Sequence, residues 1–395
     1  MQQERLWSGS FVVAMLINLV FGIVFYLLMT TMALYAVERF AAADSLAGFA
    51  SSGFVLGAVV SRVFAGRFID LLGRRRTILI ALVGFLLAAV AYFVVDSLWL
   101  LIVLRLLHGV AFGAGQSAVT TVAMALIPSH RRAEGTGYFG VSSTFSAALG
   151  PFLAIATLDA LGYEGLFGAG VAVSAAGLLL ALMLRAPERE VDLAERRGWW
   201  RFSVRSLVEP AALRISWVIL VAGLCYSGIL TFLAPFTERS GLPWATTWFF
   251  VVYGIVVMLV RLVMGRVQDS RGDNIVVYPA LASFALGLTV LALADSTWLV
   301  VASAVLIGLG FGALLPALQA IAVTLSPVHR LSTAVSTFYL LLDIGTGVGP
   351  LLLGLVLPQL GYGGMYLLLA GGAVLAAVIY FGVHGRSAGR ITATG

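Results

Sequence analysis

The fold of this protein is indicated by a charged stretch that occurs twice between apolar segments. Residues 61–76 read "SRVFAGRFIDLLGRRR" and residues 260–275 read "VRLVMGRVQDSRGDNI". The following residues recur at a constant offset of 199 positions: Arg62, Gly66, Arg67, Asp70 and Gly73 return as Arg261, Gly265, Arg266, Asp269 and Gly272. A charged loop written twice in the same place indicates an internal duplication.

The composition indicates a protein embedded in a membrane. Of the 395 residues, 61% are hydrophobic and only 11% are charged, and the mean hydropathy is +1.04. Soluble domains carry about 25% charged residues, so a water-soluble fold of this chain would expose very large apolar patches. The net charge of +6 comes from arginines in short clusters between apolar runs, which does not predict nucleic-acid binding. The single cysteine, Cys225, excludes a disulfide within the chain.

Twelve apolar runs are long enough to cross a bilayer. A bilayer core of about 30 Å needs roughly 20 apolar residues per helix, and continuous runs favour helices over the alternating strands of a barrel. We therefore predict an all-α integral membrane protein with twelve spans, at about 10–37, 45–65, 77–95, 97–120, 133–157, 165–184, 211–235, 244–265, 275–294, 297–320, 332–357 and 364–384.

The arginines predict the orientation of these spans, because loops on the cytoplasmic side are enriched in basic residues. If the N-terminus is cytoplasmic, 19 arginines fall on the cytoplasmic side, and only Arg39 and Arg239 fall outside. We therefore expect both termini in the cytoplasm of a bacterial cell, with the protein spanning the inner membrane many times.

The repeat extends well beyond the charged loops. Asp96-Ser97-x-Trp99-Leu100 returns as Asp295-Ser296-x-Trp298-Leu299, and one register without gaps covers residues 62–165. Matched turn residues in one register are not expected from chance similarity between apolar helices. We predict two six-helix bundles related by a pseudo-twofold axis, at residues 1–184 and 211–395, joined by a charged cytoplasmic linker at 185–210.

Two parallel six-helix repeats with a charged linker resemble the major facilitator superfamily. The first loop matches the family pattern G-x-x-x-D-x-x-G-R-[RK]-[RK], whereas the second copy has Asp273 and Asn274 in place of the basic tail. Arg105 and Gly109 resemble the R-x-x-x-G motif of span 4. Two glycine–proline pairs resemble the motif of the exporter branch and are interpreted as hinges: Gly150, Pro151, Gly349 and Pro350.

The paired glycines and aspartates predict a gating role for the loops. A carboxylate is favourable at a helix N-terminus, so Asp70 would bind the start of span 11 near Arg330, and Asp269 the start of span 5 near Arg131. We call each such contact a latch. If the arginines only set topology, the paired Gly and Asp remain unexplained. The predicted gating residues are Gly66, Asp70, Gly73, Arg74, Arg131, Gly265, Asp269, Gly272 and Arg330.

Proton coupling is predicted from ionisable residues inside the spans, which are functional candidates by default. Asp343 lies near the middle of the eleventh span, and Arg105 and His108 lie one turn apart in the fourth. In the family that this chain resembles, the motif arginine is associated with proton coupling in antiporters, and a histidine can itself titrate. The alternatives are a structural aspartate, a snorkelling arginine and a packing histidine.

The substrate cavity is expected to be mostly apolar and aromatic, with one acid and one base. Its predicted residues are Asn18, Tyr26, Gln116, Tyr226, Tyr253, Tyr339 and Asp343. A di- or tricarboxylate would require more arginines, so these residues favour an amphipathic or polar-neutral organic molecule.

We therefore expect a monomeric secondary transporter that exports a small molecule in exchange for protons. The alternative within transport is a sugar or metabolite facilitator or symporter. An enzyme is disfavoured because the sequence contains no HExxH, nucleophile elbow or phosphate loop. We expect no cofactor, no metal and no nucleic-acid partner, only the substrate, protons and the lipid bilayer.

Overall fold

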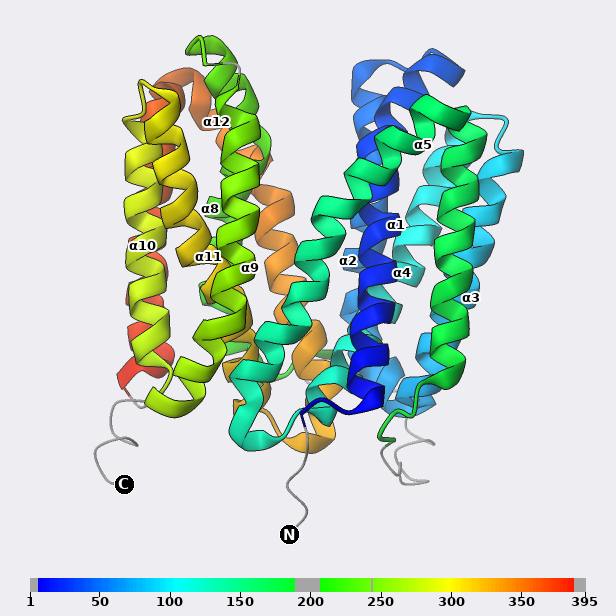
Figure 1. Ribbon diagram of the computed structural model, residues 1–395, viewed down its shortest axis with the longest axis horizontal. Helices are drawn as coiled ribbons and strands as arrows, with labels where there is room; N and C mark the ends of the chain where they lie inside the picture. Colours follow the sequence, from blue (N-terminus) through cyan, green and yellow to red (C-terminus); the bar gives the residue numbers. More distant parts are fainter. Residues whose placement is uncertain (1–5, 189–206, 243, 387–395) are drawn as a thin grey trace. The chain divides into compact units, whose positions relative to one another are not determined.

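The computed structural model describes residues 6–188, 207–242 and 244–386, and all regular structure in these ranges is helical. The helices are α1 (Gly9–Phe40), α2 (Asp44–Leu72), α3 (Arg74–Ala91), α4 (Leu98–Leu126), α5 (Arg132–Met183), α8 (Pro210–Arg239), α9 (Ala245–Arg271), α10 (Asn274–Ala292), α11 (Thr297–Leu325) and α12 (Leu331–Tyr380) (Figure 1). Residues 189–206 of the predicted linker lie outside the described residues.

The helix ends follow local sequence signals. Ser8 precedes α1, and its hydroxyl oxygen accepts the N–H of Phe11 at 3.2 Å, which satisfies one of the free donors at a helix start. Between α2 and α3, and again between α9 and α10, the chain turns at a glycine with positive φ. Gly73 has φ 93° and Gly272 has φ 90°, a conformation that a side chain would disfavour.

Within the described ranges, nine helical segments are long and apolar enough to cross a membrane. Two of them are more than 50 residues long, because α5 and α12 each continue through one non-helical glycine, Gly162 (φ 66°) and Gly361 (φ 65°). Each of these helices therefore covers two of the predicted spans. Helix α2 has 29 residues but is not among the nine. The all-helical prediction is confirmed, and the number of twelve spans stays a prediction.

The chain forms two compact units, and each is built mainly from one predicted half. Unit 1 contains residues 1–128, 142–209 and 327–337, and unit 2 contains residues 129–141, 210–326 and 338–395. Unit 1 thus includes the start of α12, and unit 2 includes the start of α5, each a short segment from the other predicted half.

Glycines allow close helix packing inside both units. In unit 1, a Cβ on Gly113 of α4 would lie 2.6 Å from the Ala58 carbonyl oxygen of α2. In unit 2, a Cβ on Gly310 of α11 would lie 2.6 Å from the Phe284 nitrogen of α10. Helices α9, α10 and α11 accordingly lie side by side (Figure 1).

Candidate functional site

The second motif loop binds the start of α5 inside unit 2. Asp269, in the last turn of α9, accepts the main-chain N–H of Ala133 at 2.9 Å and that of Glu134 at 2.8 Å. These are among the first N–H groups of α5, which have no partner within the helix. A Cβ on Gly265, one turn earlier, would lie 2.6 Å from the Glu134 Cα. The glycine therefore permits the approach that the aspartate requires.

Glu134 connects the two arginines of this region. Its carboxylate binds Arg131 and Arg266, each at 2.6 Å, and accepts the Tyr138 hydroxyl at 3.0 Å. The Glu134 side chain is 6% exposed, whereas that of Arg266 is 64% exposed, so the pair with Arg266 is screened by solvent. Sequence reasoning did not include Glu134 among the gating residues.

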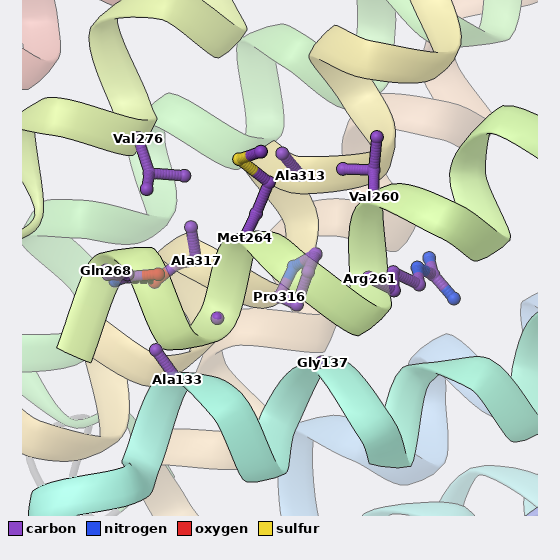
Figure 2. Close-up of a pocket in the computed structure, with 11 residues that line it drawn as sticks. Ala133, Gly137, Val260, Arg261, Met264, Gln268, Val276, Ala313, Pro316 and Ala317 are labelled. Atoms are coloured by element: carbon purple, nitrogen blue, oxygen red, sulfur yellow. Dashed lines mark hydrogen bonds between the residues drawn. The ribbon is translucent and has the colours of Figure 1, made fainter. Parts of the chain in front are cut away.

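A small pocket lies against the same contact. Figure 2 shows Met264, Gln268 and Arg261 of α9 around it, with Ala133 and Gly137 of α5 below. The Arg261 guanidinium donates to the Gly140 carbonyl of α5. Gln268 donates to the Ala317 carbonyl of α11 at 3.3 Å and to Asp273 at 2.9 Å. The start of α5 is therefore held by three side chains of α9, those of Asp269, Arg266 and Arg261.

The first motif loop makes the related contact inside unit 1. Asp70 accepts the hydroxyl of Thr333, in the first turn of α12, at 3.2 Å. A Cβ on Gly66 would lie 2.6 Å from the Thr333 Cα. Arg330, just before α12, pairs with Glu209 at 2.9 Å and donates to the Val208 carbonyl at 3.1 Å. In each unit the motif aspartate thus contacts the start of a helix, and the gating role of these contacts stays a prediction.

Arg105 is completely buried in unit 1. Its Nε donates to the Ala50 carbonyl at 3.0 Å, one terminal nitrogen donates to the Ser51 carbonyl at 2.9 Å, and the guanidinium lies 4.8 Å from the Phe54 ring centre. The other terminal nitrogen has no hydrogen-bond partner among the described residues. This arginine does not snorkel, and it joins α4 to the main chain of α2.

His108 lies one turn further along α4 and is also fully buried. Its Nδ1 is 3.2 Å from the Tyr92 hydroxyl, and its ring centre is 4.2 Å from that of Phe85. A second positive charge here would be fully buried in an aromatic cluster, one helical turn from Arg105. The surroundings therefore favour a packing histidine.

Other predicted cavity residues of unit 1 are bonded to neighbours within it. The Asn18 amide donates to the hydroxyls of Ser142 at 2.8 Å and Ser143 at 2.9 Å. Gln116 accepts from Arg62. The Tyr26 ring lies 4.8 Å from that of Phe25, and both rings are half-buried.

In unit 2 the predicted cavity residues include an aromatic stack. The Tyr226 ring stacks on Phe311 at 4.1 Å and on Tyr253 at 5.8 Å, with interplanar angles of 9° and 26°. The Tyr339 hydroxyl donates to the buried Gln319 side chain at 3.2 Å. Tyr226 and Tyr253 are half-buried, so part of each ring remains accessible.

Asp343 lies in α12 and is half-buried in unit 2. Arg105 and His108 belong to unit 1, so their predicted cooperation with Asp343 stays a prediction. The glycine–proline pairs lie inside α5 (Gly150, Pro151) and α12 (Gly349, Pro350), where each proline removes one helical hydrogen bond. Among the described residues, no group of three or more His, Cys, Asp or Glu is arranged to hold a metal ion.

Relatives of this chain are found among bacterial transporters. An MFS-type transporter of Burkholderia mallei (strain SAVP1) is 27% identical over 351 residues, which is 85% of this chain and 83% of that protein. The MFS-type transporter YhhS of Shigella flexneri is 24% identical over 338 residues, covering 81% of this chain and 79% of that protein.

Two solved structures share the fold. The human organic anion transporter MFSD10 (TETRAN) matches with a TM-score of 0.80 at 19% identity, over 96% of this chain and all of that chain. The proton:xylose symporter XylE matches with a TM-score of 0.74 at 15% identity, over 94% of each chain. At these identities the likeness concerns the fold alone.

The family profile decides the assignment. The profile of the Major Facilitator Superfamily matches residues 14–293 and 246–394, which together cover nearly the whole chain. This agrees with the resemblance of the repeated loops and with the folds of the solved structures. The chain belongs to the Major Facilitator Superfamily, and it is a multi-pass membrane transporter and not an enzyme.

Proposed function

We propose that this protein is a proton-coupled exporter of a small amphipathic organic molecule that works by alternating access. It spans a bacterial inner membrane twelve times, with both termini in the cytoplasm. The alternative is a facilitator or symporter for a sugar or other metabolite. Because XylE is by its title a proton:xylose symporter and has a similar fold, the fold alone does not choose between these functions.

The two latches support alternating access. Each consists of a few polar contacts around one carboxylate, Asp269 at α5 and Asp70 at α12. Hydrogen bonds to a charged group contribute about 1.5–3 kcal/mol each. A contact of this size is strong enough to favour one state and weak enough to be broken in every transport cycle.

The proposal of proton coupling rests on Asp343. It is a half-buried carboxyl group within α12, in a stretch where no other acid occurs between residues 331 and 380. A coupled antiporter needs a group whose charge alternates as the substrate binds and leaves. The full burial of His108 against Tyr92 and Phe85 makes the histidine a weaker candidate.

The aromatic stack supports the substrate class. Tyr226 and Tyr253 present half-buried rings with hydroxyl groups, a surface that suits a molecule with both an apolar face and polar groups. Asp343 is the one acid between residues 331 and 380 of α12, which is compatible with a neutral or cationic substrate.

Proteoliposomes test this proposal directly. The purified protein is reconstituted with a pH-sensitive dye inside, a pH gradient is imposed, and a panel of amphipathic compounds and sugars is screened for coupled proton movement. Asp343→Asn should abolish gradient-driven flux of the responding compound and leave exchange of labelled for unlabelled compound intact. Asp295→Asn, in a loop, serves as the matched control.

Two outcomes would contradict the proposal. Flux of a compound without any proton movement would identify a facilitator. Full gradient-driven flux in Asp343→Asn would show that the proton is carried elsewhere in the chain.

A further inference from the structure

The tails of the two motif loops differ in charge, and the structure gives each tail a partner. The first copy continues with Arg74 and Arg75, whereas the positions 199 residues later are Asp273 and Asn274. By sequence alone the second copy has lost its basic tail. In the structure, both tails contact the end of the last predicted span of their own half or the residues just after it.

In the first half, Glu188 binds the start of α3. Its carboxylate accepts the main-chain N–H of Arg74 at 2.8 Å and that of Arg75 at 2.7 Å. The residue before the helix is Gly73, which has no side chain to cap these donors. In return, the Arg74 guanidinium donates to the Pro187 carbonyl at 2.8 Å, and that of Arg75 to the Leu182 carbonyl at 2.9 Å.

In the second half, the acidic group is on the loop. Asp273 binds the His384 ring nitrogen Nε2 at 2.8 Å with one oxygen and accepts from Gln268 with the other. Asn274 donates to the Gly385 carbonyl and accepts the Tyr380 hydroxyl, both at 2.9 Å. His384 and Gly385 belong to a π-helical turn, Phe381–Gly385, that ends the last helix. The side chains of His384 and Asp273 are 11% and 30% exposed.

The two sets of contacts correspond to one another. In the first half, the residues bonded to Glu188 are 113 or 114 positions before it, and in the second half the bonded residues are 111 positions apart. In the first half the carboxylate lies beyond α5 and accepts from the main chain at the start of α3. In the second half the carboxylate lies on the loop, and its partner is a histidine ring at the helix end.

We infer that each motif tail is a positioning clamp for the end of its own half's last span, and that the carboxylate lies beyond the span in the first clamp and on the loop in the second. We call Arg74, Arg75 and Glu188 the first clamp, and Asp273, Asn274 and His384 the second clamp. Each clamp begins four residues after the latch aspartate, Asp70 or Asp269. The last span of each half is thereby held on the loop that carries its latch. This arrangement depends neither on the substrate nor on proton coupling.

Charge exchange in the second clamp tests the inference. Hydrogen exchange is followed by mass spectrometry on the full-length protein in detergent, using peptides that cover residues 380–386. Asp273→Arg should accelerate exchange there about tenfold, the change expected for losing roughly 1.4 kcal/mol. The double variant Asp273→Arg with His384→Glu moves the carboxylate to the helix end and restores a pair of opposite charges. It should return exchange to within about threefold of the original protein. Arg271→Glu changes charge in the same loop and should leave these peptides unchanged.

Milder variants keep the test informative if a reversed charge prevents folding. Asp273→Asn should also accelerate exchange at 380–386, and Glu188→Gln should accelerate it at 74–78 without affecting 380–386. The inference is wrong if the double variant exchanges as fast as Asp273→Arg, or if Asp273→Asn exchanges like the original protein. An effect of Glu188→Gln at 380–386 would refute the assignment of each clamp to its own half.

Discussion

Replacing Asp269 by asparagine should release the start of α5 from α9. The two carboxylate oxygens accept two main-chain N–H groups, those of Ala133 and Glu134, at 2.9 and 2.8 Å. Asparagine retains one acceptor oxygen and presents an NH₂ group to the second N–H. One hydrogen bond to a charged group is therefore lost, which costs about 1.5–3 kcal/mol. At about 1.4 kcal/mol per tenfold change, the detached population should rise roughly 10- to 100-fold.

Thiol labelling measures this population. Ala133 is 2% exposed and lines the pocket of Figure 2, so Ala133→Cys places a sulfur where there is space but little access. In a Cys225→Ser background, its rate of labelling by a maleimide should rise by the same factor in Asp269→Asn. Ser270→Ala is the matched control, because the Ser270 hydroxyl is exposed and bonds only to carbonyls within α9. Equal labelling rates in Asp269→Asn and Ser270→Ala would refute the reasoning.

Three further predictions concern burial, packing and topology. Arg105→Met removes two hydrogen bonds from the buried guanidinium to main-chain carbonyls of α2, at about 1.5–3 kcal/mol each. The Tm in detergent should fall by several degrees, and an unchanged Tm would show that the arginine is not structural. Gly66→Val places a Cβ 2.6 Å from the main chain of α12, which should destabilise the protein by about 1–3 kcal/mol. Gly254→Val is the control, because no atom lies within 4 Å of its Cβ. It should lower the Tm less than Gly66→Val in the same thermal assay. A membrane-impermeant thiol reagent should label Leu72→Cys only from the cytoplasm and Ser240→Cys only from outside, and the reverse pattern would overturn the orientation drawn from the arginines.

Structural features that occur twice in the sequence could be predicted, because the repetition is itself evidence that they belong to the fold. The helical fold follows from the apolar runs, and the family resemblance that the paired loops indicated is confirmed. The boundaries between the spans were harder to predict from the sequence. Gly162 and Gly361 interrupt α5 and α12 only locally, so each long helix contains two predicted spans. The exporter branch and the number of spans stay predictions.

The ion pairs of Glu134 could not be predicted from the sequence. Glu134 joins Arg131 and Arg266, and the latter is 132 residues away. A sequence shows which charges exist but not which of them meet after folding.

The opposite placement of the carboxylate in the two clamps bears on how the chain folds. Duplicated halves contain similar helices, so an element of one half can dock on the equivalent surface of the other while the chain is still assembling. If Glu188 approached the loop of the second half, it would meet the Asp273 carboxylate. Like charges make such exchanges unfavourable. The inverted pair therefore gives each half an identity of its own, which two identical repeats would lack.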